Sequence, residues 1–329
     1  MVKFLKEWML PIAIAVGIAF CLLTHYAPLP SGVEPVFSAF AKDLQPVLIA
    51  VMLFLQFNKI SPHDLKFRKW HFILLAIQMT MFLVLTAAAM LFPEGSTARI
   101  LSECAMLCFI CPTAAAAGVI TGKLGGSLSD TISYVVLINI AVAVTIPVVI
   151  PVFNTDSGVS FFTGFRAICM KVFPLLVLPM LLAWTVRYTC GRLQRKLMRY
   201  ADWAFYFWGI ALCLSIYLAT KALVTSGISF STAVLIGLVS LAATVLQFIA
   251  GRTAGAACTR KDAVSRVSDK ITAGQALGQK NTGFLIWLGY SYLTPVTSVA
   301  GGLYSIWQNV INSLELYLKA REDERGRIS

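Results

Sequence analysis

The sequence predicts an all-α, polytopic membrane protein with ten transmembrane helices arranged as two inverted five-helix repeats. Hydrophobic residues make up 58% and charged residues 13% of the 329 residues, and the mean hydropathy is +0.78, a composition that fits lipid as the main solvent. The apolar residues form runs of about 20 residues, the length that crosses a bilayer. These runs fall into two series of five, and the fourth run of each series is interrupted.

The first series of runs is bounded by charged residues or by Gly and Pro, which mark helix ends. The helices are predicted near residues 7–24, 36–57, 69–92, 98–122 and 127–153. The start of the chain resembles a signal peptide in its basic end and apolar stretch, but no small-x-small cleavage site follows cleanly. We therefore expect this stretch to remain as the first helix.

The second series follows the same rules of length and boundary residues. Its helices are predicted near residues 162–188, 201–223, 228–250, 265–292 and 295–318. Because five is an odd number, the second half enters the membrane from the side opposite to the first. Residues 1–160 and 161–329 are therefore expected to form two inverted repeats.

The formal net charge of +12 comes from short basic clusters between the apolar runs. If both termini are cytoplasmic, all but six of the 27 basic residues lie on the inner side, as the positive-inside rule requires. The six exceptions are Lys42, Arg99, Arg166, Lys171, Lys221 and Lys280. The pattern predicts a multi-pass inner-membrane protein with both termini in the cytoplasm, and it argues against nucleic-acid binding.

The fourth run contains the sequence CPTAAAAGVITGKLGG, in which Pro112 removes a backbone donor in mid-helix. Gly118, Gly122 and Gly126 follow at four-residue spacing. One interpretation is a tight packing seam with a proline kink. The other is a broken helix whose unwound backbone offers carbonyls to cations and half-helix amino ends to anions.

The ninth run contains GQALGQKNTGF, where Gly274 and Gly278 repeat the four-residue spacing. A polar cluster interrupts it: Gln275, Gln279, Lys280, Asn281 and Thr282. Such groups are costly in lipid unless they have partners. About half of the chain separates this cluster from Pro112, so the two interruptions occupy corresponding places in the two halves, which is typical of a transporter site.

Other kinds of site have weaker signals. The chain has no phosphate-binding loop or dinucleotide fingerprint, and its three histidines are scattered, so we expect neither an enzyme nor a cofactor. Cys104, Cys108 and Cys111 share one helical face and either bind a soft metal or metalloid or act as small buried hydrophobes. A membrane-embedded enzyme or a membrane sensor is the alternative to a transporter.

Three segments carry a resemblance to a known family. FICPTAAAAGVITGKLGG resembles the fourth-helix segment of the bile acid:sodium symporter family, GQKNTGF followed by GGLYSIWQNVINS resembles its ninth and tenth helices, and PVLIAVMLFLQFNKISPHDLK is similar to its second. The likeness covers roughly residues 10–318. It implies a panel of helices 1, 2, 6 and 7, a core of helices 3–5 and 8–10, and alternating-access transport of a small organic anion at crossing helices 4 and 9.

The resemblance fails at the sodium ligands of the family. Ala117 and Gly118 stand where the family has a Ser-Asn pair, Ala276 stands for its Glu and Lys280 for its Gln, while the helix-three Gln is retained as Gln78. Sodium is a hard cation that needs oxygen ligands, so the ordinary sodium sites should be lost. The alternatives are a sodium-coupled symporter with shifted ligands and an antiporter like the arsenite exporters.

Lys280 is the centre of the sharper hypothesis, in which its ammonium takes the place of a bound sodium ion and attracts the anion. Alternatively, Lys280 snorkels towards an interface or sits in a permanent ion pair. Glu103 and Asp130 are its possible charge partners and could carry a coupled proton, although each also fits a structural role near a helix end. The predicted substrate or ion site comprises Gln78, Pro112, Thr113, Gly118, Gln275, Gln279, Lys280, Asn281 and Thr282.

Overall fold

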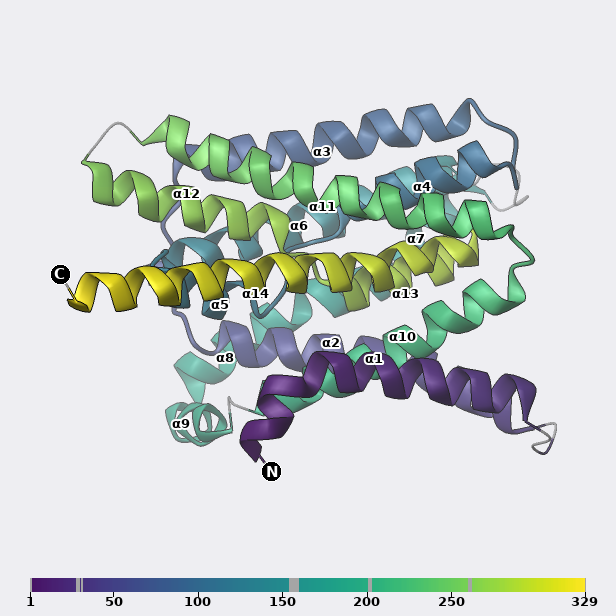
Figure 1. Ribbon diagram of the computed structural model, residues 1–329, viewed down its shortest axis with the longest axis horizontal. Coiled ribbons are helices and arrows are strands. Elements are labelled where there is room, and N and C mark those ends of the chain that lie inside the picture. The colour runs from purple at the N-terminus through teal and green to yellow at the C-terminus, as the bar shows by residue number, and fades with distance from the viewer. Residues whose placement is uncertain are drawn as a thin grey trace.

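The computed structural model describes residues 2–27, 30, 32–153, 160–200, 203–259 and 262–328. This part of the chain is all-α, with fourteen α-helices and two short 3-10 helices (Figure 1). The helices before residue 154 are α1 (Val2–Tyr26), α2 (Val33–Phe57), α3 (Lys69–Met90), α4 (Thr97–Ile110), α5 (Ala117–Lys123) and α6 (Leu128–Phe153), with the 3-10 helix η1 at Pro62–Asp64. The predicted helix class is confirmed.

The second half of the chain continues in the same manner. Its helices are α7 (Phe161–Leu176), α8 (Leu178–Thr189), α9 (Gly191–Arg199), α10 (Trp203–Thr225), α11 (Phe230–Cys258), α12 (Ala263–Gly278), α13 (Thr282–Tyr292) and α14 (Ser298–Ile328), with the 3-10 helix η3 at Pro295–Thr297. Most ends lie within a few residues of the predicted runs, because charged and turn-forming residues bound these runs.

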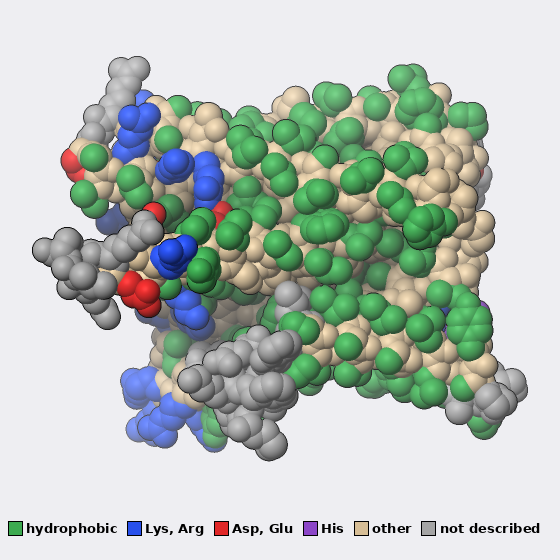
Figure 2. Space-filling view, viewed as in Figure 1, with side chains coloured by type: hydrophobic (Ala, Val, Ile, Leu, Met, Phe, Trp, Pro, Cys, Tyr) green, Lys and Arg blue, Asp and Glu red, His purple; other side chains and the backbone are tan. Residues whose placement is uncertain are grey.

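Several helices are long and apolar enough to cross a membrane. Five satisfy both conditions, namely α2, α3, α6, α10 and α11, and the pair α7 and α8, bent by 40°, makes a sixth. Hydrophobic side chains cover most of the face in Figure 2, while Lys and Arg gather at its left end, near the C-terminus. Exposed apolar surface of this extent is what lipid, rather than water, stabilises. The chain is therefore a multi-pass helical membrane protein.

The helices pack in two groups. In the first, α10 lies against α1 and α2, and α8 lies against α2. In the second, α11 packs on α12, α3 on α4, and α13 on α14. The two groups meet where α7 packs on α6, where α10 contacts α13 and α14, and where α2 contacts α13. Figure 1 shows α1, α2 and α10 along one side of the bundle, with α3, α11 and α12 along the other.

Close approach of α11 and α12 depends on glycine. A Cβ atom on Gly251 would collide with the backbone carbonyl of Ala273, and one on Gly255 would collide with that of Asp269. Gly274 and Gly278 of α12 in turn lie against Arg252 and Phe248 of α11. Small residues thus allow close packing in this hairpin. Of the three glycines predicted to form a packing seam in the fourth run, Gly118 and Gly126 are tightly packed, against Leu128 and Thr121. Gly122, in contrast, has nothing within 4 Å of the position of a Cβ.

Three differences from the predicted elements have physical causes. The run predicted at 162–188 divides into α7 and α8 at Val177, because Pro179 in the first turn of α8 has no N–H to donate to the preceding turn. The basic segment Gly191–Arg199 forms the surface helix α9, which has Arg or Lys at four of its nine positions and no fully buried residue. Helices α11 and α14 continue well past the predicted residues 250 and 318, because polar residues outside the apolar region also favour helix.

Candidate functional site

The two predicted interruptions are non-helical and touch each other. Helix α4 ends at Ile110 and α5 begins at Ala117, while α12 ends at Gly278 and α13 begins at Thr282. Between these ends, Thr113 and Lys280 form an antiparallel backbone bridge. The Ala114 N–H donates to the Gln279 carbonyl at 3.0 Å, and the Asn281 N–H donates to the Pro112 carbonyl at 2.8 Å. The fourth run is therefore broken, and a simple proline kink does not describe it.

Side chains supply donors to the carbonyls that the breaks release. Gln78 on α3 donates its Nε2 to the Cys111 carbonyl at 2.9 Å. The Thr113 hydroxyl donates to the Ala276 carbonyl at 2.6 Å, and the Tyr304 hydroxyl of α14 donates to the Gly278 carbonyl at 2.8 Å. The crossing is thus held by bonds between four different parts of the chain.

The backbone of Lys280 is held from α14 by one side chain. The Gln308 Oε1 accepts from the Lys280 N–H at 2.8 Å, and its Nε2 donates to the Lys280 carbonyl at 3.3 Å. Asn281 caps α13, because its Oδ1 accepts from the Phe284 N–H at 3.2 Å. The backbone carbonyls at the two breaks were expected to be free for cations. Those that already have a protein donor include the carbonyls of Cys111, Pro112, Ala276, Gly278, Gln279 and Lys280.

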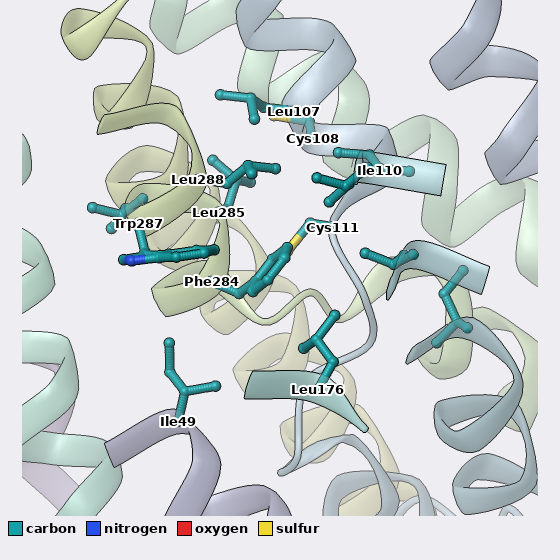
Figure 3. Packing of buried hydrophobic residues seen from close by; sticks show 14 of the residues in the cluster. Ile49, Leu107, Cys108, Ile110, Cys111, Leu176, Phe284, Leu285, Trp287 and Leu288 are labelled. Atoms are coloured by element: carbon teal, nitrogen blue, oxygen red, sulfur yellow. The ribbon is translucent and has the colours of Figure 1, made fainter. Parts of the chain in front are cut away.

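Behind the crossing lies an apolar core. Figure 3 shows Leu107, Cys108 and Ile110, at the end of α4, facing Leu285 and Leu288 of α13, and all of them are buried. The Lys280 side chain is buried beside this core, with Cys108 and Cys111 as its nearest titratable neighbours.

A cavity of about 500 Å³ lies on the other side of the crossing. Its lining includes Gly118, Gln279, Lys280, Asn281 and Thr282 of the predicted site. The walls are largely apolar and come from α2, α5, α6 and α10, with residues such as Met52, Ile132 and Trp208. Lys59 and Lys123 also line the cavity, and both are exposed. The cavity therefore runs from the crossing to a basic rim.

The remaining predicted site residues, Gln78, Pro112, Thr113 and Gln275, do not line the cavity. Gln78, Pro112 and Thr113 hold the crossing from the side of α3 and α4. Gln275 receives a hydrogen bond from the Gln279 side chain and donates its Nε2 to Glu315 Oε2 at 2.9 Å. Glu315 also forms an ion pair with Arg252.

Several polar side chains that line the cavity were not predicted from the sequence, among them Gln56, Gln308 and Asn312. Gln56 of α2 is buried with neither amide atom bonded to the described protein, and the Asn312 Oδ1 of α14 likewise has no partner there. Both residues line the cavity. Gln308 and Asn312 are four residues apart and share a helical face, so a polar stripe on an otherwise apolar helix was the available signal.

Lys280 is the most unusual residue of the site. Its side chain is 0% exposed, and no atom of the described protein accepts a hydrogen bond from its Nζ. No ion pair to Lys280 occurs within the described ranges. Both alternatives, snorkelling to an interface and a permanent ion pair, are therefore wrong.

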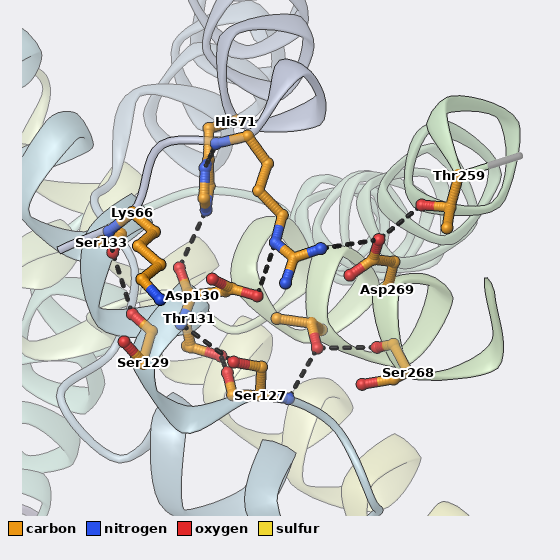
Figure 4. A network of polar contacts seen from close by, with 12 residues as sticks. Lys66, His71, Ser127, Ser129, Asp130, Thr131, Ser133, Thr259, Ser268 and Asp269 are labelled. Atoms are coloured by element: carbon orange, nitrogen blue, oxygen red, sulfur yellow. Dashed lines mark hydrogen bonds and ion pairs between the residues drawn. The ribbon is translucent and has the colours of Figure 1, made fainter. Parts of the chain in front are cut away.

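The two predicted charge partners have other roles. Glu103 accepts from Arg99 Nε at 3.0 Å and from the Thr294 N–H at 3.2 Å. Asp130 pairs with Arg68 Nε at 2.8 Å, and Arg68 also contacts Asp269 (Figure 4). Each carboxylate has an arginine closer in the fold than Lys280, so the prediction that they partner Lys280 is wrong, and the structural interpretation of both fits the contacts.

Four positions that the resemblance aligns with sodium ligands, Ala117, Gly118, Ala276 and Lys280, carry no side-chain oxygen. The retained Gln78 has one, but its Oε1 accepts from the Tyr134 hydroxyl at 3.1 Å. Ala117 and Ala276 are buried in the structure, and a Cβ on Gly118 would press on the Leu128 side chain. Cys104, Cys108 and Cys111 belong to the apolar core, and the Cys111 thiol donates to the Asn281 carbonyl at 2.9 Å. In the described part of the chain, no three His, Cys, Asp or Glu residues are grouped to hold a metal ion.

Comparison with known proteins does not name a family. No family model matches the sequence, and no curated protein matches it either. The arguments that follow rest on the geometry and chemistry of the crossing.

Proposed function

We propose that this protein is a secondary transporter that moves a small organic anion across the inner membrane by alternating access. The observation that carries the proposal is the crossing itself: two broken segments, bonded through Thr113 and Lys280, at the floor of a cavity of about 500 Å³. Irregular backbone at membrane depth is tolerated where it is buried in protein or lines a cavity, and transporter folds bind their substrates at such breaks.

The proposed architecture is a ten-span inverted repeat. The six spans that are long and apolar enough would be joined by α1, by the broken pairs α4 with α5 and α12 with α13, and by α14. The first group of helices, α1, α2, α7 with α8, and α10, would be the panel, and the others the core. The resemblance to the bile acid:sodium symporter family supports this arrangement, as does the packing of helices in two groups.

The orientation follows from charge. Exposed basic residues of α9, α12 and α14 include Arg192, Arg195, Lys196, Arg266, Lys270 and Arg321. The positive-inside rule places this end in the cytoplasm, and Figure 1 shows both termini in the same half of the view. Because Lys59 and Lys123 line the cavity, it would open to the cytoplasm.

Cavity electrostatics favour an anion. Lys59, Lys123 and Lys280 are among its lining residues, and no carboxylate is among those that the structure describes there. The amino end of α13 also begins at the crossing, where a helix favours negative charge. The apolar walls would hold a hydrocarbon body, so the preferred solute is a carboxylate or sulfonate with an apolar portion.

Sodium coupling is disfavoured by the same geometry. Most of the aligned side-chain oxygens are missing, and the retained Gln78 Oε1 accepts from the Tyr134 hydroxyl. The released carbonyls already accept hydrogen bonds from Gln78, Thr113 and Gln308. A sodium ion would have to displace these donors and also lie near the Lys280 ammonium. An arsenite-exporter-like mechanism would need a free thiol at the crossing, whereas the Cys111 thiol is engaged with Asn281.

A thermal-shift screen tests the proposal on the purified full-length protein. Carboxylates, sulfonates and arsenite would be added in sodium and in potassium buffer at several pH values. We expect stabilisation by an apolar carboxylate or sulfonate that does not depend on sodium, because a ligand of the folded state raises apparent stability, by about 2.7 kcal/mol at a hundred times its Kd.

Uptake of the same anion into proteoliposomes then separates transport from binding alone. Binding without uptake would indicate a sensor and refute transport. Strong sodium-dependent stabilisation would favour the sodium-coupled symporter with shifted ligands, and stabilisation by arsenite alone would favour the exporter. No response to any anion by a folded protein would overturn the proposal.

A further inference from the structure

The Lys280 amine lies in a part of the fold that offers it no counter-charge. The titratable groups nearest to it on α4 are the thiols of Cys108 and Cys111. On α14, the Tyr304 hydroxyl is committed to the Gly278 carbonyl. Lysine has three donors on its ammonium group and no acceptor, so the protonated form would leave every donor without a protein partner.

The carboxylate of α14 that is linked to this region through Gln275 is already neutralised. Glu315 of α14 pairs with Arg252 of α11 and accepts from the Gln275 Nε2. Gln275 in turn accepts from Gln279, which stands next to Lys280. A chain of neutral amides therefore separates the carboxylate from the amine, and Lys59 and Lys123 at the rim add only positive charge.

An isolated ammonium in such a place is costly, and a buried group of this kind loses its charge when nothing compensates it. An anion in the cavity supplies the missing compensation, because opposite charges interact strongly in a medium of low dielectric constant. Binding of the anion and of a proton must then favour each other to the same extent, since linkage between two sites is reciprocal.

We propose that Lys280 takes up one proton with each anion, so that the protein is a proton-coupled anion transporter. This inference rests on the proposed function. In the step, the lone pair of the amine nitrogen forms an N–H bond with a proton delivered by water in the cavity. When the anion leaves, that N–H bond breaks and the proton returns to water. One anion and one proton move together, so the net transfer of charge is zero.

The coupling distinguishes Lys280 from a fixed cation. A permanent ammonium would attract anions at any pH and would carry no proton with them. An amine that titrates instead requires uptake of one proton for each anion bound. Above the pH range in which the free protein is protonated at this amine, anion affinity therefore falls about tenfold for each pH unit.

Benzenesulfonate is a suitable probe for the test. It is the anion of a strong acid, so it does not cross lipid as a neutral acid and cannot carry protons by itself. The full-length protein would be reconstituted in vesicles of phosphatidylethanolamine and phosphatidylglycerol with a pH-sensitive dye inside. Uptake of labelled benzenesulfonate and acidification of the lumen would be measured in the same vesicles, in sodium and in potassium buffer.

We expect benzenesulfonate uptake to acidify the lumen with about one proton per anion, equally in both buffers. Lys280→Gln should abolish both uptake and acidification. Lys280→Arg keeps a cation that does not titrate, so it should retain anion binding in calorimetry without proton uptake. Lys270→Gln changes an exposed lysine in the middle of α12, the helix that ends just before Lys280, and should leave both signals unchanged.

The other possible results separate a failure of proton coupling from a failure of the proposed function. Uptake without acidification by the unaltered protein would overturn proton coupling and leave the proposed function standing. Absence of uptake for benzenesulfonate and for every anion of the thermal-shift screen would overturn both. If the Lys280 variants do not fold, the acidification stoichiometry of the unaltered protein alone decides the question.

Discussion

Arg99 and Lys280 are both buried cations, but the fold treats them differently. Arg99 is 6% exposed, pairs with Glu103 at 3.0 Å, donates to the Ala89 carbonyl at 2.7 Å and stacks 3.9 Å from the centre of the Phe153 ring. Lys280 is 0% exposed and its Nζ has no acceptor among the described protein atoms. Protein groups compensate the charge of Arg99, whereas no described protein group compensates a charge on Lys280, so a bound anion could do so.

Breaking the Arg99 pair should have the largest effect. Arg99→Leu leaves the Glu103 carboxylate buried without its partner, so we expect a loss of about 3–5 kcal/mol in the free energy of unfolding. The double variant with Glu103→Leu should recover part of this loss. Unfolding in mixed micelles of SDS and a mild detergent would measure both. A loss below about 1 kcal/mol for the single variant would contradict the structural role of this pair.

Removing the side chain that holds the Lys280 backbone should have a smaller effect. Gln308→Leu leaves one N–H without its acceptor and weakens one carbonyl contact, which should cost about 1–3 kcal/mol. Gln56→Leu is the matched control, because this buried amide lines the same cavity with no bond to the described protein. It should change the same unfolding free energy by less than about 0.5 kcal/mol or increase it.

Removing the Lys280 amine should change stability least among these substitutions. Lys280→Met keeps most of the buried chain and deletes a group without partners, so unfolding free energy should stay within about 1 kcal/mol of the original or rise. Anion-induced stabilisation should disappear in the same variant. A loss as large as that of Arg99→Leu would show that the two cations do not differ as the contacts indicate.

Exchange of sodium for potassium should have no effect on the melting temperature beyond about 1 °C, because neither ion has a prepared site of side-chain oxygens at the crossing. Differential scanning fluorimetry at constant ionic strength would measure this. A stabilisation that grows with sodium concentration would mean that released carbonyls bind a cation despite their protein donors.

Helix positions could be predicted well from the sequence, because length, hydropathy and boundary residues act locally. Pro112 and the polar cluster around Lys280 likewise identified the two breaks. Pro179 also lay in the printed sequence as the signal for the division of α7 from α8, and basic residues at helical spacing in Gly191–Arg199 were the signal for α9. These were errors of interpretation rather than missing information.

The partners of the buried polar groups could not be predicted in this way. Whether Glu103 meets Arg99 or Lys280 depends on helix rotation, since about 100° separates neighbouring residues of a helix. The bonds from Gln78 to Cys111 and from Gln308 to Lys280 join different elements of the fold. Such contacts depend on the tertiary arrangement, which no local pattern fixes.

The Cys111 thiol gives the protein a built-in reporter. It is 0% exposed and bonded to the Asn281 carbonyl across the two breaks, so a maleimide reagent can reach it only when these segments separate. The alkylation rate of this sulfur, read by mass spectrometry beside exposed Cys190 as an internal standard, would time the opening of the crossing in membranes without an introduced label.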